Sequence, residues 1–245
     1  KLYLKIWVQL MIQFKKNMKF SYVFSILFLS INVFSIENYV AEYRWESSDR
    51  DILGVRKLVI EENGASSLSF KANKSFIKLD IETDFKFLNK KVESKEYSVG
   101  VKPTIANRSQ KLFFNNIENS INSKGRYEWS ANTISKSVLD PLNAQIQVRM
   151  NVLDGYKDFS IDIIEMKDGT IEPNFYKVTS ENVDCYVGDD KYSCIEVTRL
   201  RKYDDRKTIY LIAKDLGYMF VKIKDVDLDP KKNQTLSLEK ILSLG

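Results

Sequence analysis

The sequence predicts a mostly β protein: a single antiparallel curved sheet, or partly open β-barrel-like domain, with one covering helix at about residues 141–154. Short segments alternate apolar and polar residues with the period of a β-strand. Turn signals separate these segments at a spacing typical of antiparallel sandwiches and barrels. One further segment has the spacing of an amphipathic helix, which we expect to cover the sheet.

The first predicted strand, residues 39–46, alternates apolar and polar residues throughout. The other predicted strands are residues 55–62, 66–72, 75–87, 111–117, 126–131, 159–166, 170–179, 183–187, 192–200, 206–213, 218–224 and 234–241. Turns are expected at Asn63-Gly64 and at residues 119–125, 167–169, 215–217 and 229–233. The charged residues 92–98 and Pro103 are predicted to lie in loops or at sheet edges.

The predicted helix has recognisable ends. Asp140 can accept hydrogen bonds as the N-cap, and Pro141 suits the first helical position. Gly155 suits the C-terminal stop. The apolar face consists of Leu142, Ile146, Met150 and Leu153.

Residues 1–35 have the composition of a signal peptide with extra residues ahead of it. Lysines precede an uncharged, apolar run at residues 20–36, which is short of the roughly 20 apolar residues that span a bilayer. Val33 and Ser35 are suitable small residues for a cleavage site, so we expect cleavage near Ser35. An uncleaved N-terminal anchor is the alternative, and it would be the only membrane contact expected.

The sequence starts at Lys1, and Met11 or Met18 is the expected translation start. We therefore expect an upstream extension plus signal peptide at residues 1–35, and one β-rich periplasmic domain at residues 36–245.

The positive charge of the chain lies in its N-terminal segment. The full sequence has a net charge of +5, and residues 1–35 contain five lysines and no acid. The remaining residues balance 33 basic against 33 acidic side chains. A balanced domain has no long-range attraction for nucleic acid, so no nucleic-acid partner is expected.

The two cysteines, Cys185 and Cys194, are predicted to form a disulfide. If Asp189 and Asp190 form a two-residue hairpin loop, the cysteines face each other with Cα atoms about 4.5 Å apart, within disulfide range. An oxidising compartment would let the bond form. Two separate buried thiols are the alternative. Neither cysteine follows the apolar run, so no lipid attachment site is expected there.

Histidine is absent, which excludes Ser-His-Asp and Cys-His nucleophiles and histidine-based metal sites. A carboxylate-based glycan hydrolase remains an alternative. Its candidate pairs are Asp162 with Glu165 and Asp204 with Asp205, and ordinary solvated acids are the simpler interpretation. The string Asp225, Asp227 and Asp229 lacks the glycine and glutamate of a calcium-binding loop. We predict no catalytic, metal-binding or cofactor-binding residues.

Aromatic residues make up 12% of the chain and many occupy predicted strands. They either fill an ordinary core or line an apolar groove that holds a lipid, an acyl chain or another hydrophobic ligand. These residues include Tyr39, Tyr43, Trp45, Phe159, Phe175, Tyr176, Tyr210, Tyr218 and Phe220.

The C-terminal half resembles an exported bacterial family, domain of unknown function 3108 (DUF3108). The segment Leu139-Asp140-Pro141-Leu142-Asn143-Ala144, followed by Arg149 and Gly155, resembles the DPLS-type helix of that family. Tyr127-Glu128-Trp129 resembles its FDW-like strand, and Cys185-Tyr186-Val187-Gly188 resembles its TPLG turn.

Later segments extend the resemblance, which is clearest over residues 127–241. Ile195-Glu196-Val197 resembles the strand after the turn, and residues 209–213 and 218–223 resemble the W-x-A-P and L-P-V-R-I stretches. Tyr210 stands where tryptophan is usual, and Phe220 where proline is usual. The resemblance implies a periplasmic, β-rich protein and supplies no catalytic residues.

Three functions follow as hypotheses. The first is a non-enzymatic envelope protein that binds a hydrophobic ligand or another envelope component. The second is a structural module whose sheet edges pair with a partner. The third is the carboxylate-based hydrolase of cell-wall glycans, which predicts two carboxylates about 5–9 Å apart in a cleft. The sequence makes no prediction of oligomeric state.

Overall fold

The protein is described from a computed structural model. Residues 1–35, which include the predicted signal peptide, lie outside the described residues. From Ile36 to Gly245 the chain forms one compact unit. The described residues of this unit are 36–61, 64–74, 77–102, 109–133, 137–200 and 206–245.

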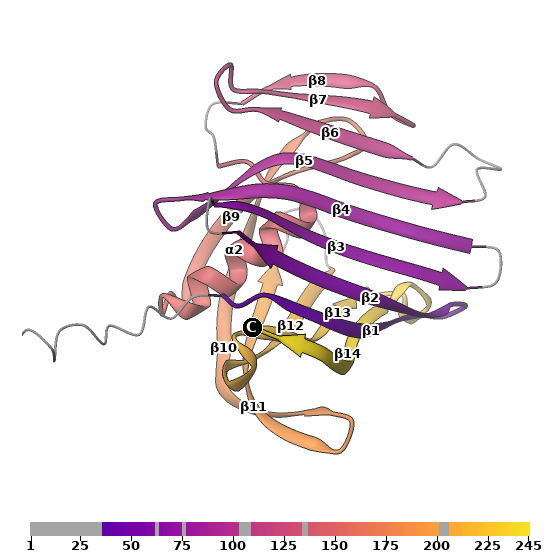
Figure 1. The fold of residues 1–245 in the computed structure, drawn as a ribbon, viewed down its shortest axis with the longest axis vertical. Helices are drawn as coiled ribbons and strands as arrows, with labels where there is room; N and C mark the ends of the chain where they lie inside the picture. Colours follow the sequence, from indigo (N-terminus) through magenta and orange to yellow (C-terminus); the bar gives the residue numbers. More distant parts are fainter. Residues whose placement is uncertain (1–35, 62–63, 75–76, 103–108, 134–136, 201–205) are drawn as a thin grey trace, which may run out of the picture. The chain divides into compact units, whose positions relative to one another are not determined.

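The described chain forms one 14-stranded antiparallel sheet that is not closed, with the helix α2 (Pro141–Leu153) against it (Figure 1). The sheet and helix confirm the predicted fold class. The first eight strands are β1 (Tyr39–Ser47), β2 (Asp51–Ile60), β3 (Ala65–Lys74), β4 (Ile77–Leu88), β5 (Lys91–Lys102), β6 (Gln110–Asn115), β7 (Ser120–Gly125) and β8 (Trp129–Asn132). The later elements are β9 (Asp158–Ile164), β10 (Ile171–Val187), β11 (Asp190–Leu200), β12 (Lys207–Ala213), η1 (Lys214–Leu216), β13 (Met219–Val226), η2 (Pro230–Lys232) and β14 (Gln234–Leu244).

The strand order divides the sheet into two halves, which meet where the first strand pairs with the last. Strands β1–β8 form the N-terminal half-sheet and β9–β14 form the C-terminal half-sheet, each a simple succession of neighbours. The halves join where β1 pairs with β14, with Tyr39 opposite Leu244. The sheet bends, and Figure 1 shows α2 on the inner side of this bend. The helix contacts β4, β5 and β9.

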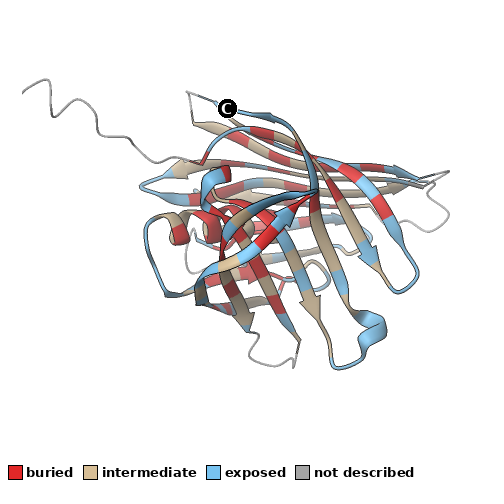
Figure 2. Cartoon of the chain, turned by 90° about the horizontal axis from the view of Figure 1, so that it is seen from below, coloured by how far each residue is buried: buried red, intermediate tan, exposed pale blue. Residues whose placement is uncertain are grey.

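The interior face of the sheet follows the two-residue period of its strands. In β2, the residues Ile52, Gly54, Arg56 and Leu58 are buried and their neighbours in the first eight positions are exposed. Figure 2 shows the same banding of buried and exposed residues along neighbouring strands. The buried faces and α2 together enclose the core.

The ends of α2 form as the sequence predicts. Asp140 is the N-cap and Pro141 opens the helix. At the other end, Gly155 has a φ of +85°, which suits a residue without Cβ. The N–H of Gly155 donates to the carbonyl of Val152, and the N–H of Tyr156 donates to that of Asn151. These two bonds are a Schellman motif, which satisfies carbonyls at the end of the helix.

The prediction of a turn over residues 119–125 and of a loop or edge over residues 92–98 was wrong. Residues 120–125 form β7, and residues 92–98 lie within the interior strand β5. The polar sequence of β7 misleads because only Ile121 and Ser123 are buried in it. Two glutamates of β5 pair with neighbouring strands: Lys86 with Glu93 at 3.0 Å, and Lys111 with Glu96 at 2.9 Å.

Cys185 and Cys194 form a disulfide with their Cα atoms 5.9 Å apart. The predicted strand register around the bond was wrong, since Cys185 lies opposite Tyr192 and not opposite Cys194. The two-residue loop is Gly188-Asp189, because Val187 pairs with Asp190. Gly188 has a φ of +58°, and a glycine at the first central position is what a type II′ hairpin turn requires.

Candidate functional site

Two adjoining pockets lie inside the bend, beside the first turns of α2. The apolar pocket has a volume of about 400 Å³ and is lined mainly from the N-terminal half-sheet. The polar pocket has a volume of about 550 Å³ and is lined from the C-terminal half-sheet. The side chain of Gln145, half-buried on α2, lines both. Both volumes are in the range of small-molecule sites.

The strand register connects the two pockets directly. Trp45 of the apolar pocket lies opposite Leu236, which also lines that pocket. Leu236 lies opposite Ile223, and Ile223 lies opposite Tyr210. Ile223 and Tyr210 line the polar pocket. One row of cross-strand neighbours therefore runs from one pocket into the other.

The apolar pocket has a hydrophobic lining that comes from six strands and α2. Five of these strands are β1 to β5, and the sixth is β14. Its main apolar side chains are Trp45, Ile52, Phe70, Ile81, Leu142 and Leu236. This combination of aliphatic and aromatic surface suits an apolar ligand.

Arg56 is the buried charge of the apolar pocket, with 2% of its surface exposed. Its Nε donates to the hydroxyl of Tyr39 at 2.9 Å, and its Nη2 donates to Oε1 of Gln145 at 2.7 Å. The guanidinium carbon lies 5.7 Å from the ring centre of Tyr43 and 6.0 Å from that of Phe220. These contacts fix the position of the guanidinium by hydrogen bonds and cation–π attraction.

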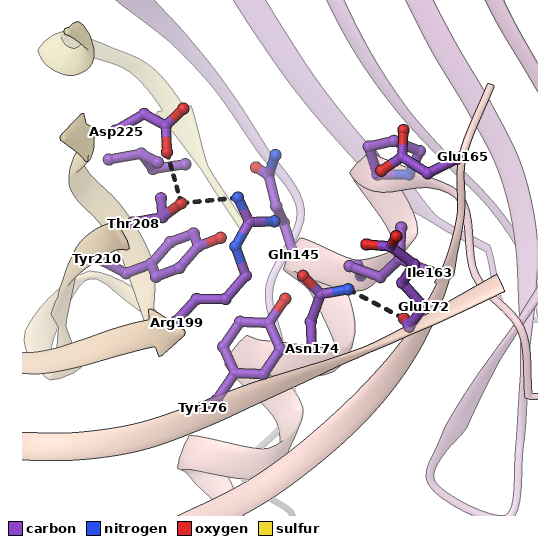
Figure 3. Close-up of a pocket in the computed structure, with 13 residues that line it drawn as sticks. Gln145, Ile163, Glu165, Glu172, Asn174, Tyr176, Arg199, Thr208, Tyr210 and Asp225 are labelled. Atoms are coloured by element: carbon purple, nitrogen blue, oxygen red, sulfur yellow. Dashed lines mark hydrogen bonds between the residues drawn. The ribbon is translucent and has the colours of Figure 1, made fainter. Parts of the chain in front are cut away.

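The polar pocket contains a chain of hydrogen bonds that begins at Arg199 (Figure 3). Nη2 of Arg199 donates to Oγ1 of Thr208 at 2.6 Å, and Thr208 Oγ1 donates to Asp225 at 2.8 Å. The other carboxylates that line this pocket are Glu165 and Glu172. The polar pocket therefore combines one cation with three acids.

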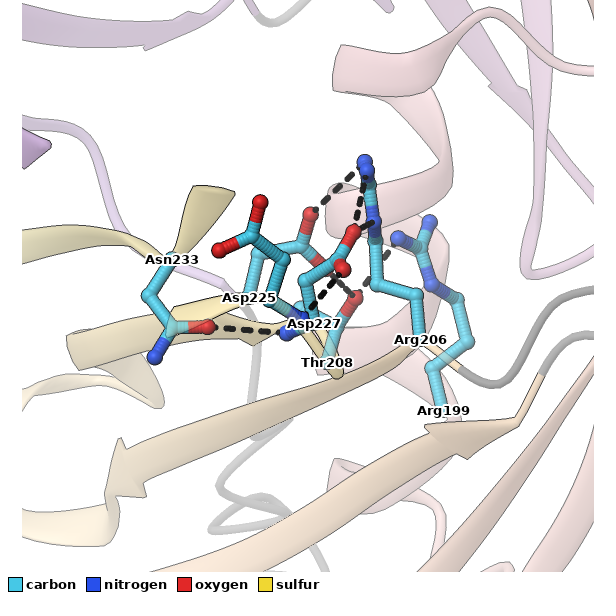
Figure 4. Close-up of polar contacts among 7 residues, drawn as sticks. Arg199, Arg206, Thr208, Asp225, Asp227 and Asn233 are labelled. Carbon is cyan, nitrogen blue, oxygen red and sulfur yellow. Dashed lines mark hydrogen bonds and ion pairs between the residues drawn. The ribbon is translucent and has the colours of Figure 1, made fainter. Parts of the chain in front are cut away.

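The acidic string at residues 225–229 is engaged by protein groups (Figure 4). Arg206 pairs with Asp225 at 3.5 Å and with Asp227 at 2.7 Å. The backbone N–H of Asp229, and then the side chain of Arg206, lower the pKa of Asp227 below its ordinary value. Asp229 accepts from the N–H of Lys231 and is the N-cap of η2. Among the described residues, no group of three or more cysteine, aspartate or glutamate side chains could hold a metal ion.

Asp140 connects α2 to the N-terminal half-sheet. Its Oδ1 accepts from the backbone N–H groups of Leu142 and Asn143, both at 2.9 Å. Its Oδ2 accepts from the hydroxyls of Thr83 at 2.9 Å and Ser94 at 2.8 Å. Burial raises the pKa of Asp140, and these donated hydrogen bonds oppose that shift. Asp140, which belongs to the segment that resembles the DPLS-type helix, thus has a structural role here.

Arg149 connects α2 to the C-terminal half-sheet. It is 1% exposed, and it donates to the carbonyl oxygens of Tyr218 at 2.7 Å and Gly217 at 2.8 Å. Its guanidinium carbon lies 5.4 Å from the ring centre of Tyr39. Burial lowers the pKa of Arg149. The helix is therefore bonded to both halves of the sheet, and this holds the pockets between them.

Several of the aromatic residues that were expected to fill the core or line a groove form a continuous row inside the C-terminal half-sheet. Phe159 stacks on Tyr176 with ring centres 5.2 Å apart, Tyr176 lies 6.1 Å from Tyr210, and Tyr210 lies 5.4 Å from Phe220. Phe175 is different, since it is 49% exposed on the outer face. Alternation along β10 explains this, because adjacent residues of a strand point to opposite faces.

Asp162 and Glu165, one of the two carboxylate pairs suggested for hydrolysis, do not line the same pocket. Glu165 lines the polar pocket, whereas Asp162 lines a separate pocket beside Val92. Asp204 and Asp205 lie outside the described residues. Sequence reasoning did not single out Arg56 or Gln145. The available signal was weak: Arg56 falls on the same face of β2 as the buried residues Ile52 and Leu58.

In the part of the chain that the structure describes, no helix has the length and apolar character needed to cross a membrane. No protein-family model matches the sequence, and no curated protein matches it. The resemblance to DUF3108 therefore stays a prediction.

A solved structure is similar to this fold: the crystal structure of a β-barrel-like protein of domain of unknown function DUF1849 from Brucella abortus. The similarity covers 84% of this chain and 97% of that chain, with a TM-score of 0.53 and 12% sequence identity. At that identity the likeness concerns the fold alone. The described chain is thus similar in fold to a β-barrel-like protein of unknown function.

Proposed function

We propose that the protein is an exported, non-enzymatic protein of the cell envelope that holds a hydrophobic ligand in the apolar pocket. The observation that supports this proposal is a pocket of about 400 Å³ whose lining is mostly aliphatic and aromatic. A filled core would pack these side chains against one another, because protein interiors leave few voids larger than a water molecule. An apolar ligand would remove the exposed lining from water, which is favourable.

The proposed periplasmic location rests on two features. The signal-like residues 1–35 precede the β-rich domain. The disulfide between Cys185 and Cys194 is a second feature, since such bonds persist in oxidising compartments and are rare in the cytosol.

Ligand carriage is tested with a substitution that fills the pocket. Ile81 lines the apolar pocket, and tryptophan at that position would occupy its space. Lys78 is exposed and lies on the opposite face of the same strand, so Lys78→Trp is the matched control. The probe is N-phenyl-1-naphthylamine, a neutral apolar dye whose emission increases when it leaves water.

We expect the wild type and Lys78→Trp to bind the dye and Ile81→Trp to lose binding. Mass spectrometry of organic extracts then examines protein purified from its native envelope. A hydrophobic molecule should accompany the wild type and be depleted from Ile81→Trp. Ligand-free protein that also fails to bind the dye would contradict the proposal.

A further inference from the structure

The charges that line the apolar pocket are all positive. Arg50 and Arg56 line it, and none of its described lining residues is aspartate or glutamate. Arg50 is exposed and pairs with Asp49 at 3.6 Å, so its charge is partly balanced by a neighbour. Arg56 is different, because its hydrogen-bond acceptors, Tyr39 and Gln145, are both neutral.

A buried cation without a counter-charge is costly. Arg56 is 2% exposed and forms no ion pair among the described residues. Its hydrogen bonds to the described residues come from Nε and Nη2, and Nη1 donates to none of them. Arg56 therefore retains donor capacity and positive charge inside a mainly apolar pocket.

Gln145 supplies a second donor at the same place. Its Oε1 accepts from Arg56, so its Nε2 forms the other branch of the amide and can only donate. Among the described residues, the hydrogen bond of this side chain is the one that its Oε1 accepts, and Nε2 donates to none of them. Two donors with unused capacity and one buried positive charge favour an anion over a neutral or cationic group.

The apolar lining extends away from Arg56 along β2. Ile52, near the start of β2, and Arg56 lie on the same face, four residues apart, which corresponds to about 13 Å along a strand. Gly54 lies between them and contributes no side chain. A Cβ at this position would lie 2.5 Å from the ring of Phe70. Glycine therefore leaves the space that this ring occupies in the pocket lining.

The polar pocket does not offer the same attraction. Arg199 is accompanied there by Glu165, Glu172 and Asp225, and it donates to Thr208. This mixture of charges gives no net preference for an anion. The anionic group is therefore expected on Arg56, in the apolar pocket.

We propose that the apolar pocket binds a single-chain amphiphile with a carboxylate head, and that this head lies on Arg56 and Gln145 with its alkyl chain along the apolar lining. This inference rests on the proposed function and specifies its ligand class. Recognition combines a charge-assisted hydrogen bond from a buried arginine with burial of the alkyl chain.

The test compares three ligands with the same chain and different heads: decanoate, decanol and decyltrimethylammonium. Their affinities for the purified, delipidated protein are measured by isothermal titration calorimetry. We expect decanoate to bind at least about tenfold more tightly than decanol, and the cation to bind most weakly.

Gln145→Glu is the diagnostic variant, because it places a carboxylate beside Arg56 without a large change in volume. The new carboxylate should pair with Arg56 and weaken decanoate binding by about tenfold or more, which removes the preference for decanoate over decanol. Gln147→Glu is the matched control. That side chain accepts from the N–H of Val92 through Oε1, lines a different pocket, and should leave both affinities unchanged.

Equal affinities for decanoate and decanol, or an unchanged decanoate preference in Gln145→Glu, would overturn the carboxylate inference and leave ligand carriage intact. Absence of binding by both decanoate and decanol would overturn the proposed function itself. Circular dichroism and thermal unfolding of each variant distinguish loss of binding from loss of folding.

Discussion

Nε of Arg149 in α2 donates a 2.7 Å hydrogen bond to the carbonyl oxygen of Tyr218, the residue before β13. Tyr218 has a φ of +60°, an uncommon conformation for a residue with a side chain. The preceding Gly217 has a φ of +57° and offers its carbonyl to the same guanidinium. The buried arginine therefore stabilises a tight turn in the C-terminal half-sheet.

Arg149→Met should destabilise the protein by about 2–4 kcal/mol, because two carbonyl groups lose their donors. The free energy of unfolding is measured by urea titration. A loss within about 0.5 kcal/mol of zero would show that these bonds contribute little to stability.

Asp140→Ala should lower the free energy of unfolding by about 3–5 kcal/mol, since the helix loses its N-cap and the Thr83 and Ser94 hydroxyls lose an acceptor. Asp140→Asn keeps one acceptor oxygen and should cost less. Asp154→Ala is the control at the opposite end of the helix, where the side chain accepts only from exposed Lys90. Its cost should be below about 1 kcal/mol. Similar losses in the three variants would contradict the assigned role of Asp140.

The double substitution Cys185→Ser and Cys194→Ser should reduce stability by about 2–3 kcal/mol, the chain-entropy value for a short closed loop. Reduction of the wild type with dithiothreitol should produce a comparable loss. Peptide mapping without reduction checks the bond directly, and two free thiols in the native protein would refute it.

The acid limb of the stability profile should depend on Asp227. Its lowered pKa means that the folded protein binds this proton less readily than the unfolded chain does. Asp227 therefore stabilises the fold above the ordinary carboxylate range, and this contribution disappears as the pH falls through that range. We expect Asp227→Asn to be less stable than the wild type near pH 7 and the difference to shrink toward about pH 3.

Urea titrations across this pH range measure the difference. Asp189→Asn is the control, because Asp189 is exposed in the disulfide hairpin and forms no hydrogen bond or ion pair with the described residues. If the difference in free energy of unfolding between Asp227→Asn and the wild type does not change with pH, the titration of Asp227 does not contribute to stability.

Local sequence signals predicted the elements whose causes are local. Asp140, Pro141 and Gly155 define the helix because each acts within a few residues of its position. Period-two alternation predicted β1 in the same way. The strand β7 was missed because its outward positions are polar and its interior positions include Ser123, so the apolar period is weak.

The candidate site could not be predicted because its residues meet only in the folded chain. Arg56 and Gln145 are 89 residues apart and come from a strand and a helix. The row from Trp45 through Leu236 to Ile223 depends on the pairing of β1 with β14. The predicted register around the disulfide was wrong for a local reason, since the positive φ of Gly188 places this residue in the first position of the two-residue loop.

The pairing of β1 with β14 has a consequence for how the chain folds during synthesis. Strand β1 is among the first parts of the sheet to leave the ribosome, and its partner β14 is the last. Of the strand pairs that the structure describes, this one joins the residues farthest apart in sequence. Such pairings form slowly because loop closure must precede them. A circular permutant opened between β8 and α2 would turn this pair into a local hairpin and make the whole sheet a simple meander.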